Sequence, residues 1–112
     1  MALLPNYRNA IIPDEKIYDY CLNPNHERGQ HKAKVFRQVF GITAEDGELL
    51  KSAILFQLDK YEITTETENK FGKIFTLPMK ISIFGKTDEV ITAWIIENGV
   101  DYPRLVSCYV NK

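Results

Sequence analysis

The sequence predicts an α+β fold in which two to three N-terminal helices pack on a four-stranded antiparallel β-meander. Up to about residue 58, apolar residues recur at spacings of three and four, which is typical of amphipathic helices. After Lys60 the period changes to two, and the segments are rich in β-branched and aromatic residues. The connections between these later segments are too short for the crossovers that parallel strands need, so antiparallel hairpins are expected.

The first helix is expected at 13–22. Pro13 suits a first helical turn, and the two acids that follow it favour the positive end of the helix dipole. Ile17, Tyr20 and Cys21 lie at i, i+3 and i+4, so they form one apolar face, and an Asn-Pro-Asn sequence then ends the helix.

The second and third helices are expected at 30–40 and 44–58. Gly41 offers a C-terminal stop for the second helix, and Thr43 offers an N-terminal cap for the third. The predicted buried residues of the second helix are Val35, Phe36, Val39 and Phe40. Those of the third helix are Leu49, Leu50, Ala53, Ile54 and Leu58.

The four strands are expected in YEITTETE, KIFTLPMKISIF, EVITAWII and RLVSCYV. Pro78 interrupts the second of these runs, which predicts a bulge, a bend or an edge position there, because proline lacks the N–H that a ladder needs. Both faces of the third strand are fairly apolar. We expect Ile91, Ala93 and Ile95 to meet the helices, which leaves Thr92 and Trp94 on a second, concave surface.

Length and composition are those of one cytoplasmic domain spanning 1–112. The apolar start of the chain is interrupted by Pro5 and Asn6 well short of a membrane span, and no signal peptide is recognisable. Cys21 and Cys108 are far apart in sequence and have no CxxC spacing, so reduced thiols are expected. A disulfide between them is the alternative.

The charge of the chain is nearly balanced, with 14 Lys and Arg against 15 Asp and Glu. This excludes the globally basic proteins that coat nucleic acid, so any nucleic-acid contact must be local. Positive charge does concentrate in 26–37, which holds four Lys or Arg, two His and only one acid.

Lys32 lies over the predicted buried stripe of the second helix, since it precedes Phe36 by one helical turn. One interpretation is that its aliphatic stem packs on apolar surface while the ammonium reaches water. The other is that the ammonium awaits an anionic partner such as a phosphate, because a cation in a first helical turn is unfavourable for the helix dipole.

His26 and His31 flank the start of this helix, where an imidazole can act as a general acid or base, although a surface histidine without a role is the commoner case. A metal site is not predicted, because a spacing of five places the two off a common helical face and no HExxH or paired CxxC is present. Arg104 opens the last strand and could hold a phosphate or pair with an acid. Motifs for nucleotide cofactors are also lacking, so no cofactor is expected.

Several sequence patterns resemble an uncharacterised bacterial domain family that is frequent in cyanobacteria. They are LPN and AII near the start, YCLNPN, H..RG..KA..F at 26–36, and WII..G.D.PRLVS.YV at 94–110. The family and its order of helices before strands resemble the barnase/EndoU/colicin/RelE group of small metal-independent ribonucleases, many of which are toxins. The pattern marks His26, Gly29, Lys32, Trp94 and Arg104, with Ser107 where a threonine is expected.

The resemblance implies a toxin-like endoribonuclease whose substrate is RNA. In it, His26, His31, Lys32 and Arg104 would be catalytic, and the substrate would be bound by Thr92, Trp94, Ser107 and Tyr109. The alternative is a non-catalytic protein-binding or immunity-type module. Under both interpretations a small acidic partner or antitoxin protein is expected.

Overall fold

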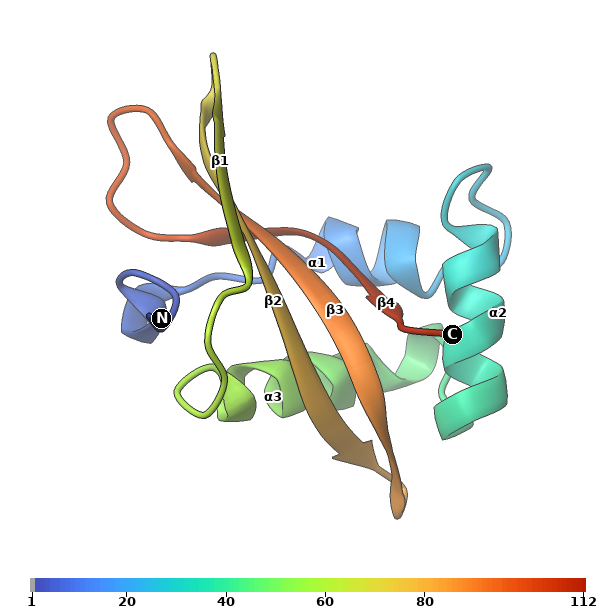
Figure 1. The fold of residues 1–112 in the computed structure, drawn as a ribbon. Coiled ribbons are helices and arrows are strands. Elements are labelled where there is room, and N and C mark those ends of the chain that lie inside the picture. Colours follow the sequence, from blue (N-terminus) through green and yellow to red (C-terminus); the bar gives the residue numbers. More distant parts are fainter. Residues whose placement is uncertain (1) are drawn as a thin grey trace.

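The computed structural model describes residues 2–112 and confirms the α+β fold (Figure 1). The helical elements are η1 (Tyr7–Asn9), α1 (Asp14–Lys16), η2 (Ile17–Cys21), α2 (Gln30–Phe40), η3 (Ala44–Asp46) and α3 (Gly47–Gln57). The strands are β1 (Thr65–Asn69), β2 (Gly72–Ile83), β3 (Lys86–Glu97) and β4 (Arg104–Val110). They form one antiparallel sheet in the order β1-β2-β3-β4, as predicted.

The first predicted helix is a single α-turn, α1, that continues as the π-helical turn η2. The wider turn is closed by the Leu22 N–H, which donates to the Ile17 carbonyl at 2.9 Å. Ile17 and Cys21 are fully buried, while Tyr20 is only half-buried. Single π-turns of this kind are frequent at functional sites.

Helix α2 begins and ends as the sequence predicts. At its start the imidazole Nδ1 of His26 accepts hydrogen bonds from the backbone N–H groups of Arg28 and Gly29, at 3.0 and 2.9 Å. At its end Gly41 adopts a left-handed conformation with φ 75° and donates to the Arg37 carbonyl.

Helix α3 follows the 3-10 turn η3, where the Thr43 N–H donates to the Asp46 carboxylate at 2.9 Å. Three predicted residues of its apolar face, Leu50, Ile54 and Leu58, are buried. The prediction is wrong for Leu49, which is 46% exposed.

Short hairpins set the register of the sheet. Phe84 and Gly85 both have positive φ, which matches the two-residue turn that the twist of a hairpin favours. Pro78 pairs with Ile91 on one side and lies beyond the end of β1 on the other, so the edge position is the one of the three predicted alternatives that is observed.

The assignment of the two faces of β3 was wrong. Thr92 and Trp94 are fully buried in the core, and Trp94 pairs with Phe75 and Leu105. The other face carries Ile91, Ala93 and Ile95. Their alternation follows from the pleat, but which face meets the helices was not fixed by the apolar pattern.

Within residues 2–112, none of the helices has both the length and the apolar character that a membrane crossing requires.

One ion pair gives the fold a predicted acid sensitivity. The Asp88 carboxylate lies 2.8 Å from the Lys112 ammonium, which lowers the pKa of Asp88, and the backbone N–H of Glu89 lowers it further. A lowered folded-state pKa contributes stability above the unfolded-state value, 3.8, and that stability is lost as the pH falls through the lower folded value. We expect Asp88→Asn to lose less stability than the native chain between pH 5 and about pH 2, measured by thermal melts. A steeper acid loss in the variant would contradict this role.

Candidate functional site

Lys32 is the centre of the candidate site. Its ammonium Nζ donates a hydrogen bond to the Tyr20 hydroxyl at 2.8 Å and lies 4.7 Å from the centre of the Tyr20 ring and 5.8 Å from that of Tyr109. No carboxylate among residues 2–112 lies within ion-pair distance of it. The half-buried ammonium thus contacts a hydroxyl group and two aromatic rings rather than an acid.

His26 extends this group from the loop before α2. Its ring packs edge-on against Tyr20, with the ring centres 4.9 Å apart. Because Nδ1 accepts two backbone hydrogen bonds, a neutral His26 carries its hydrogen on Nε2. In this state the ring is a hydrogen-bond donor rather than a base.

Ser107 lies two residues before Tyr109 on β4, but its hydroxyl is buried. It lies opposite Ala93 at the bulge in β4, and its Oγ has no hydrogen-bond partner among residues 2–112. We call the group formed by Tyr20, His26, Lys32 and Tyr109 the Lys32 cluster. It joins the π-turn, the start of α2 and the end of β4.

Two buried thiols lie beneath the Lys32 cluster. Cys21 and Cys108 are neighbours and both are free, as predicted. A hydrogen bond with Cys108 lowers the pKa of Cys21, and the charge of Lys32 lowers it further. The pKa of Cys108 is raised by the same contact with Cys21 and by burial.

Arg104 does not join the cluster. The register places it opposite Ile95, and its guanidinium contacts the Glu97 carboxylate at 3.1 and 3.2 Å. It lies five residues before Tyr109 on β4, about 16 Å along an extended strand. The predicted convergence of Arg104 with Lys32 is therefore not observed.

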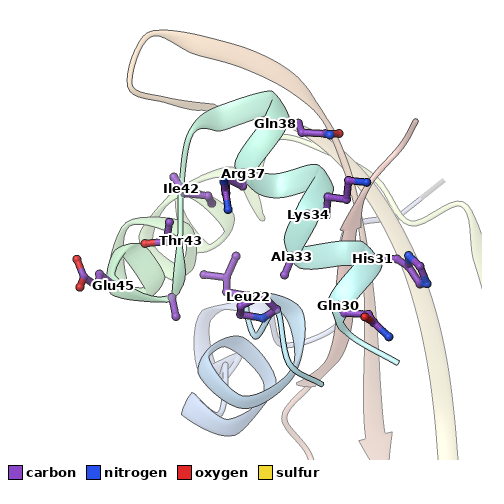
Figure 2. A pocket seen from close by; sticks show the side chains of 12 residues that line it. Leu22, Gln30, His31, Ala33, Lys34, Arg37, Gln38, Ile42, Thr43 and Glu45 are labelled. Carbon is purple, nitrogen blue, oxygen red and sulfur yellow. The ribbon is translucent and has the colours of Figure 1, made fainter. Parts of the chain in front are cut away.

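Three more of the predicted site residues lie elsewhere. His31 is exposed on the other flank of α2, and Figure 2 shows its ring directed away from Leu22 and Ile42. Thr92 and Trp94 have no exposed surface. The Trp94 indole N–H donates to Thr92 Oγ1 at 2.8 Å, and that hydroxyl donates to the Leu77 carbonyl at 2.6 Å. Their polar groups are thus satisfied inside the core.

Sequence reasoning missed Tyr20 as a site residue. Helical spacing places it on an apolar helix face, but in the structure it lies in the π-turn η2 and its hydroxyl accepts a hydrogen bond from Lys32, 12 residues later. The hydroxyl of Tyr20 is the feature that could have identified it, because a tyrosine at the edge of a core usually finds a hydrogen-bond partner.

The fold has a counterpart among solved structures. A chain of a contact-dependent growth inhibition toxin–immunity protein complex from Klebsiella pneumoniae 342 is similar, with a TM-score of 0.65 over 96% of this chain and 97% of that chain. The two sequences are 10% identical, so the likeness concerns the fold alone. No curated protein sequence matches the chain.

The sequence itself places the chain in a family. Residues 3–112 match a domain of unknown function, DUF6883, which accounts for nearly the whole length. The chain therefore belongs to the DUF6883 family.

Proposed function

We propose that the protein is a metal-independent, toxin-like endoribonuclease that acts at the Lys32 cluster. The observation that carries this proposal is the half-buried Lys32 ammonium, which lies near two tyrosine rings and has no carboxylate partner among residues 2–112. A phosphodiester is an anion that such a cation can hold.

The proposed reaction is attack of a ribose 2′-oxygen on the adjacent phosphorus. The bond from phosphorus to the 5′-oxygen breaks, which leaves a 2′,3′-cyclic phosphate and a 5′-hydroxyl. The 2′-hydroxyl releases its proton to solvent, and the 5′-oxygen takes a proton from the Tyr20 hydroxyl, which regains one from solvent, so no water is consumed. Such a step needs positioned charge and hydrogen bonds at the phosphorus.

Each member of the cluster has a role in this proposal. Lys32 would stabilise the extra negative charge on the phosphoryl oxygens. The Tyr20 hydroxyl accepts from Lys32 and keeps its own hydrogen free, so it can donate toward the leaving oxygen. His26 Nε2–H would bind a phosphoryl oxygen, and the 41% exposed Tyr109 would contact the ribose or a base.

Incubation of the protein with total RNA in EDTA tests the proposal. We expect fragments with 2′,3′-cyclic phosphate ends, and we expect Lys32→Ala to slow their formation by about 10²-fold or more. Tyr20→Phe keeps the ring but removes the hydroxyl, so it should also slow cleavage. Lys73→Ala, an exposed lysine on β2, is the matched control and should cleave like the native chain.

Cleavage that survives both Lys32→Ala and His26→Ala would refute this site. Absence of cleavage for every RNA tested would instead favour the second candidate, a protein-binding or immunity-type module. That candidate has an observation of its own, because Arg104 is neutralised by Glu97 and the Nδ1 of His26 is occupied by the backbone. Both groups are then less available for catalysis.

A further inference from the structure

A groove runs along the flank of α2 opposite to Lys32. It lies between α2 and the segment 42–45, encloses about 720 Å³, and has Leu22 at its base (Figure 2). This volume is in the range of protein sites that bind ligands or anchor side chains of a partner. We call it the α2 groove.

The floor of the α2 groove is apolar. It is formed by Leu22, Ala33 and Ile42, which are 2%, 6% and 0% exposed. These side chains are already packed into the core, so the floor is rigid and needs little rearrangement to receive another apolar group. An aliphatic side chain placed there would remove its own apolar surface from water.

The two walls of the groove differ in charge. The α2 wall carries the exposed cations Lys34 and Arg37, spaced three residues apart, and neither of them forms an ion pair among residues 2–112. The opposite wall carries the carboxylate of Glu45. In Figure 2, Arg37 lies beside the groove near Ile42, and Glu45 lies across from α2.

We propose that the α2 groove docks an acidic segment of a partner protein, which inserts one aliphatic side chain between the walls. Carboxylates along the edge of the segment that faces α2 would pair with Lys34 and Arg37. Glu45 would disfavour carboxylates on the other edge, which fixes the orientation of the segment. Charge complementarity of this kind favours one partner over others and speeds association.

The lining favours protein over RNA. Among the described residues that line the groove there is no Phe, Tyr or Trp, and the ring of His31 is directed away from Leu22 and Ile42 (Figure 2), so the groove floor lacks the aromatic platforms on which unpaired bases stack. An apolar floor within a polar rim is instead the usual arrangement of a protein interface. The inference does not rest on the proposed ribonuclease activity, because Lys32 does not line the groove.

Fluorescence anisotropy with defined peptides tests the proposal. The probe is a labelled helical peptide of about 14 residues with a leucine stripe and glutamates elsewhere. One control peptide has lysine in place of glutamate, and another has serine in place of leucine. We expect the acidic leucine peptide to bind at least about tenfold more tightly than either control.

Paired variants locate the binding. Lys34→Glu with Arg37→Glu should weaken the acidic leucine peptide about tenfold or more. Lys70→Glu with Lys73→Glu makes the same charge change on exposed residues at the β1–β2 hairpin and should leave binding unchanged. Thermal melts verify that all variants are folded.

Equal binding of the three peptides, or equal weakening by both variant pairs, would overturn the proposal. A short labelled RNA is the competing probe. If Lys34→Glu with Arg37→Glu abolishes RNA binding while the acidic peptide is unaffected, the groove serves nucleic acid and the proposal is wrong. Loss of RNA cleavage in Lys32→Ala with unchanged peptide binding would separate this site from the proposed active site.

Discussion

Replacing Trp94 by alanine is expected to lower the free energy of unfolding by about 3–5 kcal/mol. The side chain is fully buried between the sheet and the helices, and it pairs with Phe75 on β2 and Leu105 on β4. Alanine would leave a cavity in a core whose neighbouring strands cannot close it fully. The same change removes the indole N–H that holds Thr92.

The hydrogen bonds that link Trp94, Thr92 and the Leu77 carbonyl contribute to stability separately from packing. Thr92→Val keeps nearly the same volume, but it leaves the Trp94 N–H without an acceptor and the Leu77 carbonyl without its side-chain donor. A buried polar group left unpaired costs about 1–3 kcal/mol, so this variant should be destabilised less than Trp94→Ala.

Urea denaturation followed by far-ultraviolet circular dichroism measures both effects, since the signal does not depend on the tryptophan. Phe71→Ala is the matched control, because Phe71 is an aromatic residue that is 60% exposed and should contribute little. A Trp94→Ala protein with native stability would contradict the core role of Trp94 and would favour the surface position that the sequence predicts.

The failed prediction for Trp94 has a physical origin in β3. Its two faces carry comparably apolar residues, so alternation identifies the strand but not the face that meets the helices. Ile95 illustrates the ambiguity, because it is only 8% exposed although it lies on the face opposite Trp94. Tertiary packing, which the local pattern does not contain, decides between the faces.

The features that could be predicted depend on neighbours in sequence. The helix end at Gly41 and the edge position of Pro78 follow from the backbone chemistry of one residue. The position of Lys32 at the rim of the core follows from helical spacing, and the structure has it half-buried.

The remaining site geometry depends on long-range register. Arg104 lies beside Glu97 because the β3–β4 hairpin brings them together, and the bulge between Leu105 and Ser107 shifts the pairing by one residue. Neither the partner of Arg104 nor the shift in pairing is encoded by a local sequence pattern. The sequence therefore could not show that Arg104 lies apart from Lys32 rather than in one catalytic site with it.

Gly29→Ala is expected to destabilise the protein by about 2–3 kcal/mol, although alanine favours a helix over glycine by about 1 kcal/mol. A Cβ atom at Gly29 would lie 2.0 Å from the Tyr20 carbonyl oxygen and 2.8 Å from its carbonyl carbon. These are backbone atoms of the π-turn, so relief requires η2 and the start of α2 to separate. The φ of Gly29 is −86°, so the cost comes from this contact and not from its backbone conformation.

Because Tyr20 contacts both His26 and Lys32, the same separation should disturb the Lys32 cluster. Urea denaturation gives the loss in stability, and the NMR signals of the Tyr20 ring report its displacement. Gly99→Ala is the control: no atom of residues 2–112 lies within 4 Å of its added Cβ, and its φ of 81° should cost only about 1 kcal/mol. A Gly29→Ala protein as stable as the native chain, with unshifted Tyr20 signals, would show that the π-turn and α2 are not tightly joined. The half-buried Lys32 would then need another explanation for its fixed position.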